Sequence, residues 1–255
     1  MAFTTNDGVR IHWDEKGSGS PVLLVMGAAY SSRMWYPVID ALAEHHHVIW
    51  FDNRGIGQSP AVRHGSIEDM AADAVAVLDA AGVEKAHVYG VSLGGVVALQ
   101  LALQSPGRVL SLVLGCTGIL DDAKPRAPKY ANLFAHLPRR LLFAKTSYGS
   151  ATPAEAVARD QAVLRADKAS AAGLKQQQDA LRAYSVTKEQ VAGLTFPSLV
   201  LHGKEDATVK YEVGVELAET LPNAKLVTYE GAAHNYLVSY PEQANADVLA
   251  FLASV

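Results

Sequence analysis

The segment Gly90–Gly95 (GVSLGG) places a serine in a turn between an apolar strand, expected at 86–89, and an apolar helix, expected at 96–103. A chain that passes from strand to helix so abruptly strains the backbone at the serine. Glycines two positions away on each side give the flanking segments room to pass each other. The hydroxyl is then exposed at the carboxyl edge of the sheet, near free N–H groups of a helix N-terminus that can hold an oxyanion. The spacing therefore predicts that Ser92 is a nucleophile.

A serine nucleophile needs a histidine base, and the base needs an acid that orients it. In an open parallel sheet, such groups belong in loops at the carboxyl ends of the strands. Of the nine histidines, His234 follows the last expected strand, at 226–229, and Asp206 follows the strand expected at 198–202. The sequence thus predicts the chain order nucleophile, acid, base.

The residues leave alternatives open for both partners of the serine. His202 could compete as the base, although a histidine that ends a strand beside a glycine more often packs against that loop or braces it. Asp121 and Asp122 follow the strand expected at 109–114 and are alternatives for the acid. The run His45–His47 is expected to be a solvated loop and not a metal site, because adjacent side chains point in different directions.

The elements that must position these groups alternate between strand and helix over most of the chain. This alternation requires an α/β fold in which helices cover both faces of a mostly parallel sheet. The segment 9–15 alternates apolar and polar residues, which indicates an edge or antiparallel strand. Further strands are expected at 22–26, 48–51, 86–89, 109–114, 198–202 and 226–229, and helices at 34–43, 67–81, 96–103, 213–221 and 241–252.

The middle of the chain, from about Gly118 to Val191, differs in character. It has no β-branched run and is rich in Ala, Lys, Arg and Gln. One helix is expected to start at Thr152, which can act as the cap, with a proline at the first helical position and a glutamate at the third. Another helix is expected at 168–184. We therefore expect one core domain, formed by residues 1–117 and 192–255, with a helical cap inserted at 118–191.

Composition narrows the classes of function. The chain of 255 residues is 49% hydrophobic and 19% charged, with a formal net charge of −4, which is typical of a globular protein and not of a disordered one. The absence of a basic stripe argues against nucleic-acid binding. We expect no membrane span, since no apolar run approaches ~20 residues, and no signal peptide, since the first residues lack a basic region followed by an apolar one. The single cysteine, Cys116, is expected to be a buried packing residue in a reducing compartment, so the protein is expected to be cytoplasmic.

Together these segments resemble the α/β-hydrolase family over nearly the whole chain. The resemblance rests on Gly90–Gly95, on Asp206 in its loop, on Gly231–His234, and on Asp52–Ser59, which matches the family's D-x-R-G-x-G-x-S pattern. It implies an α/β-hydrolase fold with a helical cap. We expect Asp52 and Arg54 to hold their loop together and not to catalyse.

The resemblance also implies an oxyanion hole made of two backbone N–H groups. One is that of Leu93, directly after the nucleophile, and the other is mapped to Ala28, after the early strand. Many relatives have His-Gly where this chain has Met26-Gly27. This departure leaves the backbone donors intact.

The implied function is the hydrolysis of a small or medium carboxylic ester or lactone through an acyl-enzyme, with no cofactor, no metal and a small-molecule substrate as the partner. An enol-lactonase of aromatic catabolism, a cofactor-free haloperoxidase or perhydrolase, and a carbon–carbon hydrolase are alternatives that use the same groups. A ligand receptor without turnover is a further alternative, which a complete triad disfavours. Pocket residues are expected at Met34, Trp35, Tyr130, Phe134 and Phe143, with core packing an equal explanation for Met34 and Trp35.

Overall fold

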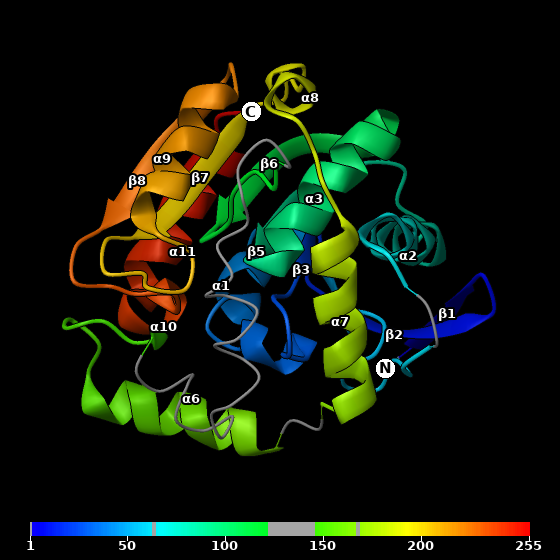
Figure 1. Ribbon diagram of the computed structural model, residues 1–255, viewed down its shortest axis with the longest axis horizontal. Coiled ribbons are helices and arrows are strands. Elements are labelled where there is room, and N and C mark those ends of the chain that lie inside the picture. The colour runs from blue at the N-terminus through cyan, green and yellow to red at the C-terminus, as the bar shows by residue number, and fades with distance from the viewer. Residues whose placement is uncertain (1, 63–64, 122–145, 167–168) are drawn as a thin grey trace.

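The computed structural model describes residues 2–62, 65–121, 146–166 and 169–255. Within these ranges the strands form one sheet in the order β1-β2-β4-β3-β5-β6-β7-β8 (Figure 1). The pairs β1–β2 and β2–β4 are antiparallel, and the remaining pairs are parallel. The mostly parallel α/β sheet is therefore confirmed. The strands are β1 (Ala2–Asn6), β2 (Val9–Lys16), β3 (Ser20–Val25), β4 (His46–Phe51), β5 (Ala86–Val91), β6 (Val109–Gly115), β7 (Ser198–Gly203) and β8 (Ala224–Tyr229).

Strand β1 was not anticipated from the sequence. It forms a hairpin with β2 in which Asn6 pairs with Val9 across a two-residue turn. Both turn residues, Asp7 and Gly8, have positive φ, at 47° and 73°. Asp-Gly is a preferred sequence for such tight hairpin turns, so this dipeptide was the available signal for the missing strand.

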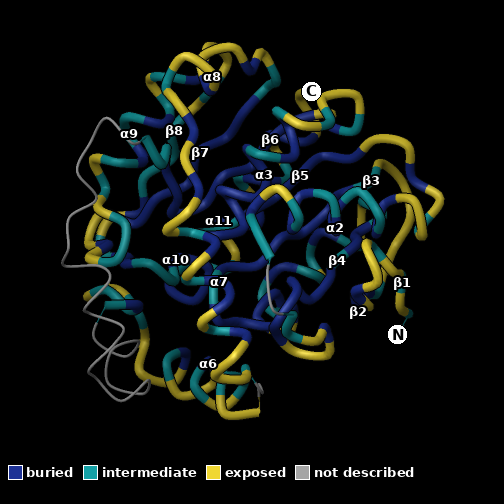
Figure 2. Tube along the Cα trace, turned by 45° about the vertical axis from the view of Figure 1, so that its right-hand side comes forward, coloured by how far each residue is buried: buried dark blue, intermediate teal, exposed yellow. Residues whose placement is uncertain are grey.

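Two hydrophobic clusters cover the two faces of the sheet. Helices α2 (Ile67–Ala80), α3 (Leu93–Gln104), α8 (Lys188–Ala192) and α9 (Tyr211–Thr220) pack in one cluster. Helices α1 (Ile39–Ala43), α10 (Tyr236–Ser239) and α11 (Pro241–Leu252) pack in the other. In β3, Leu23 and Val25 join the first cluster, and Val22 and Leu24 join the second. Figure 2 shows the interior of the sheet in the dark blue of buried residues. Burial on both faces explains why such strands appear in the sequence as unbroken apolar runs.

The helix predicted at 34–43 is wrong in its middle. The chain instead forms a 3₁₀ turn, η1 (Ser32–Trp35), followed by α1. Pro37 lies between them and has no N–H with which to continue a helical hydrogen-bond ladder. The side chain of Trp35, at the end of η1, is fully buried, and its ring centroid lies 4.9 Å from that of Tyr89.

The described part of 118–191 is helical and contains no strand. Its helices are α6 (Ala154–Ala166), α7 (Ala171–Ala183) and most of α8. Helix α7 begins later than predicted, because Ser170 caps it by accepting a hydrogen bond from the Gly173 N–H. Helices α6 and α7 contact loops that follow β3, β4 and β8, beyond the carboxyl ends of the strands. None of the helices in the described ranges is both long enough and apolar enough to cross a membrane.

The loop 52–59 is held by two separate sets of contacts. Its two charged residues, Asp52 and Arg54, bind different partners and do not form an ion pair with each other. Asp52 accepts hydrogen bonds from the N–H and hydroxyl of Ser32 and from the Gln58 N–H. Arg54 instead reaches α2, where two of its nitrogens lie 2.7 Å from the carboxylate oxygens of Asp73. The two residues tie the loop to different parts of the fold.

The Arg54→Met substitution is expected to destabilise the protein by about 3–5 kcal/mol, because it leaves the fully buried Asp73 carboxylate without its charge partner. The measurement is the free energy of unfolding from chemical denaturation. Lys16→Met is the matched control, since Lys16 and Asp40 form an exposed ion pair that is expected to contribute about 0–1 kcal/mol. Equal losses in the two variants would show that burial does not govern the Arg54 pair.

Candidate active site

Ser92 lies at the junction of β5 and α3 with a backbone conformation of φ 54° and ψ −119°. Positive φ at a residue with a side chain costs about 1–3 kcal/mol and persists only where the surroundings enforce it. The enforcing contact is close packing of the flanking turn: a Cβ added at Gly94 would lie 1.9 Å from the Val25 carbonyl oxygen. The strained turn expected from the sequence is present.

The end of β6 supports this turn from the side. The Ser92 N–H donates to the Gly115 carbonyl over 2.8 Å, and the Thr117 hydroxyl donates to the Ser92 carbonyl over 2.8 Å. The backbone of Ser92 is thus fixed by hydrogen bonds, while its side chain remains partly exposed.

The loop after β3 packs directly against the serine. A Cβ added at Gly27 would lie 3.3 Å from the Ser92 Cβ and 3.9 Å from its Oγ, so the loop passes close beside the serine. Among the described residues, the N–H groups of Ala28 and Leu93 have no hydrogen-bond partner. These are the two amides to which the family resemblance assigns the oxyanion hole.

The next amide along, that of Ala29, is already used. Its N–H donates over 2.8 Å to Oε1 of Gln177, which projects from α7. Between the two neighbouring amides, the geometry therefore favours Ala28 as the free donor.

His234 and Asp206 meet as the sequence predicts. His234 follows β8, and its Nδ1 lies 2.7 Å from Oδ2 of Asp206. The other carboxylate oxygen, Oδ1, accepts the N–H groups of Thr208 and Val209 over 2.8 and 2.9 Å. A carboxylate accepts, so Nδ1 carries the imidazole proton and Nε2 is left as a proton acceptor.

The Asp206 carboxylate is fully buried but has several donors. Burial acts to raise its pKa, but the charge interaction with His234 and the hydrogen bonds from His202, His234 and the Val209 amide lower the pKa below the ordinary carboxyl value. A lowered pKa means that the carboxylate stabilises the fold at neutral pH, and that this stabilisation is lost only as the pH falls below the ordinary carboxyl range.

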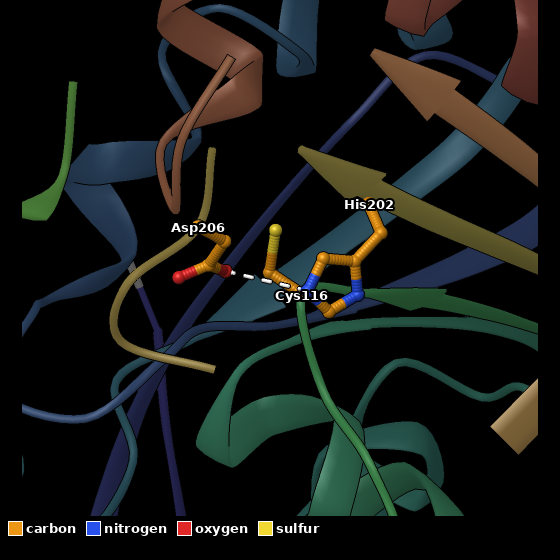
Figure 3. A group of neighbouring side chains, drawn as sticks. All are labelled: Cys116, His202 and Asp206. Atoms are coloured by element: carbon orange, nitrogen blue, oxygen red, sulfur yellow. Dashed lines mark ion pairs between the residues drawn. The ribbon is translucent and has the colours of Figure 1, made fainter. Parts of the chain in front are cut away.

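Cys116 and His202 surround the same carboxylate (Figure 3). Ligand atoms of Cys116, His202 and Asp206 lie within 4.8 Å of one another, which raises the question of a metal site. His202 Nε2 lies 2.9 Å from the Val209 carbonyl, which can only accept, so this nitrogen carries a proton. Burial and the nearby Asp206 charge raise the pKa of the Cys116 thiol. Since metal ligands must be deprotonated, these donors fit the stabilisation of Asp206 and not a metal ion.

His202 was the alternative base. It is fully buried, its Nε2 is 3.4 Å from Asp206, and a Cβ added at Gly214 would lie 2.1 Å from its Nδ1. Its Nδ1 is therefore covered by α9, and its Nε2 is bound to the Val209 carbonyl and lies near Asp206. The geometry favours His234 as the base and His202 as a brace of the acid loop.

Of the expected pocket residues, the structure describes Met34 and Trp35. Met34 and Trp35 lie in the core cluster on the α1 and α11 face, and core packing accounts for both positions. Tyr130, Phe134 and Phe143 lie outside the described residues, as does Asp122. Asp121 is described and half-buried, after the end of β6.

Sequence reasoning missed a buried carboxylate of the cap. Asp160 of α6 is fully buried and accepts hydrogen bonds from the Tyr148 hydroxyl (2.6 Å), the Tyr36 hydroxyl (3.1 Å) and Nδ2 of Asn235 (3.3 Å). Burial raises the pKa of Asp160. Asn235 directly follows His234, so α6 is connected to the histidine loop. The available signal was that Asp160 lies four residues after the buried Ala156, on the inner face of its helix.

Comparison with known proteins identifies the family. Residues 20–239 match the family model described as alpha/beta hydrolase fold. The chain belongs to this family. The resemblance inferred from the sequence is thereby confirmed, together with a hydrolase class of enzyme.

Three similar proteins align with this chain over nearly its whole length. A protein of Azorhizobium caulinodans that carries the provisional name carbamate hydrolase RutD is 30% identical, over 100% of this chain and 99% of its own. A Mycobacterium tuberculosis protein provisionally named non-heme bromoperoxidase BpoC is 30% identical, over 97% and 99%. The solved structure of Est816, described as an N-acyl homoserine lactone degrading enzyme, superposes with a TM-score of 0.82 at 28% identity, over 98% of this chain and 100% of that one.

Proposed function

We propose that the protein is a serine hydrolase that cleaves small or medium carboxylic esters or lactones through Ser92, His234 and Asp206. The observation that carries the proposal is the 2.7 Å hydrogen bond between His234 Nδ1 and Asp206 Oδ2. This bond leaves Nε2 unprotonated, as a general base must be. The strained Ser92 turn and two free amides supply the other parts that acyl transfer requires.

In the acylation step, Ser92 Oγ attacks the substrate carbonyl carbon while His234 Nε2 takes the hydroxyl proton. The carbonyl π bond breaks, and its electron pair moves to the oxygen, which the Leu93 and Ala28 N–H groups stabilise. The tetrahedral intermediate then collapses, the bond to the alkoxy oxygen breaks, and His234 returns its proton to that oxygen. Asp206 stabilises the imidazolium that exists between the two proton transfers.

In the deacylation step, water replaces the alcohol. His234 takes a proton from the water as its oxygen attacks the acyl carbon, and the same two amides stabilise the second oxyanion. Collapse breaks the bond to Ser92 Oγ, which regains its proton from His234. For a lactone, the alcohol produced stays attached to the acid because the ring has opened.

A carbamate is the second candidate substrate, because a full-length relative carries the name of a carbamate hydrolase. The same groups would attack a carbamate carbonyl. Its nitrogen makes that carbonyl less electrophilic, so cleavage of a carbamate would need additional contacts that stabilise the transition state.

The test is a substrate panel combined with covalent labelling. We expect turnover of activated acyl esters from acetate to decanoate or of lactones, with simple carbamates as the comparison set, and we expect a fluorophosphonate to modify Ser92. Peroxide-dependent halogenation that requires acetate would point to the perhydrolase alternative. Failure of the probe to label Ser92, with no turnover of any class, would contradict the proposal and favour a ligand receptor.

A further inference from the structure

The cap helix α7 reaches the loop that carries the proposed oxyanion donor. Oε1 of Gln177 accepts the Ala29 N–H over 2.8 Å, although the two residues are 148 positions apart in sequence. Gln177 is only 1% exposed. This contact is therefore a buried hydrogen bond between the cap and the residue directly after Ala28.

The backbone at this point needs support. Ala29 has φ 70°, a left-handed conformation that glycine adopts freely and alanine does not. The peptide plane between Ala28 and Ala29 carries the N–H that Gln177 holds, so the bond fixes the orientation of this plane. On its other side, Ala28 is attached to Gly27, which packs against Ser92. The Ala28 N–H lies in the preceding peptide plane, between Gly27 and Ala28. Its direction is therefore restrained by Gly27 on one side and by the held Ala28–Ala29 plane on the other.

The amide nitrogen of Gln177 supports a specific role for its Oε1 as the acceptor of the Ala29 N–H. Its Nε2 is buried, and among the described residues it has no hydrogen-bond partner. A buried donor without a partner is unfavourable, and an apolar side chain would avoid this cost. A glutamine at this position is explained if the Ala29 N–H needs an uncharged acceptor.

We propose that Gln177 is a positioning residue for the oxyanion hole, through which α7 orients the Ala28 N–H toward the reacting carbonyl. The inference rests on the proposed function, since it assumes that Ala28 stabilises an oxyanion. It goes further by assigning the cap a part in catalysis as well as in substrate selection. A cap helix that is displaced would leave the loop less restrained and the acyl transfer slower.

Helix α7 also offers a neighbouring glutamine as a control residue. The adjacent Gln176 is buried too, and its Oε1 accepts the Val62 N–H over 3.0 Å. Its Nε2 likewise has no partner among the described residues. Gln176 thus makes the same kind of bond from the same helix, but to the chain beyond β4 and not to the loop beside Ser92.

The experiment compares Gln177→Met with Gln176→Met, using hydrolysis of an activated acetate ester and thermal unfolding. We expect kcat to fall about 10–100-fold in Gln177→Met with KM nearly unchanged, because a displaced oxyanion donor weakens only the transition state. Gln176→Met is expected to change kcat less than about threefold. Its melting temperature is expected to fall by about as much as that of Gln177→Met. Where Gln177→Met does not fold, Gln177→Asn serves in its place, because the shorter side chain withdraws the acceptor from Ala29 but stays polar.

Two further readouts separate positioning from stability. A trifluoromethyl ketone forms a tetrahedral adduct with an oxyanion, so its Ki is expected to rise by the factor by which kcat/KM falls. Adding Ala29→Gly to Gln177→Met is expected to restore part of kcat, because glycine accepts the left-handed conformation without the external hydrogen bond.

The inference is overturned if Gln177→Met keeps kcat within threefold of Gln176→Met, or if the ketone binds both variants equally well. Wild-type turnover and labelling of Ser92 distinguish this failure from failure of the proposed function. Where wild-type protein is active and labelled, a null result concerns Gln177 alone. Where it is neither, the proposed function fails and the role of Gln177 fails with it.

Discussion

The Ser92→Ala variant is expected to lose ester hydrolysis by at least ~10³-fold in kcat/KM while it folds like the wild-type protein. The loss follows because the remaining histidine and amides have no nucleophile to activate. The fold is retained because two hydrogen bonds of the Ser92 backbone, from its N–H to the Gly115 carbonyl and from the Thr117 hydroxyl to its carbonyl, do not involve the side chain that is removed. Measurements of kcat/KM and of the melting temperature on the same preparation test both parts.

Ser105→Ala is the matched control, since Ser105 caps the opposite end of the same helix without a side-chain capping bond. Its activity and its melting temperature are expected to stay close to those of the wild type. Retention of most activity in Ser92→Ala would exclude Ser92 as the nucleophile.

The Asp206→Asn variant is expected to lower kcat by about 10³–10⁴-fold. The two backbone N–H groups of Thr208 and Val209 require an acceptor at the Oδ1 position, so an asparagine would place its carbonyl there. Its NH₂ group would then lie at the Oδ2 position, facing His234 Nδ1. A donor at that place shifts the imidazole proton to Nε2, where it prevents His234 from acting as a base.

The measurement combines kinetics with ¹⁵N NMR of the imidazole, which reports the tautomer directly. Asp121→Asn is the control, because Asp121 follows the neighbouring strand β6 and was the alternative acid. It is expected to change kcat only slightly. An essential Asp121 beside a dispensable Asp206 would show that the acid is misassigned, and an unchanged tautomer in Asp206→Asn would contradict the mechanism given for the loss.

Much of the fold could be predicted because the information is local. A strand buried on both faces must be apolar throughout, so β3 and β6 stand out in the sequence. The missed or misplaced elements lack this property. Strand β1 has five residues, none of them fully buried, and α10 has only four residues, so neither has a long apolar pattern. Between η1 and α1, the apolar spacing continued across Pro37, although the hydrogen-bond ladder could not.

The candidate site divides in the same way. Ser92 lies in a contiguous motif, and Asp206 and His234 follow strands that a parallel sheet brings to one edge, so rules of chain order were sufficient to propose them. Gln177 and Asp160 are joined to the core by hydrogen bonds to Ala29, Tyr36 and Asn235, all of them at least 75 positions away in the sequence. No periodicity or spacing encodes such contacts, because they depend on how the cap helices settle on the core.

Cys116 has a practical consequence for experiments on this molecule. It is the single cysteine of the chain, it is 1% exposed, and it lies against the carboxylate of Asp206. A thiol reagent can reach it only when the surrounding structure opens. Under conditions where closing is faster than modification, the labelling rate of unmodified protein measures the free energy of local opening around the acid loop. Labelling of Cys116 would therefore measure how often the loop that carries the proposed acid opens in the folded protein.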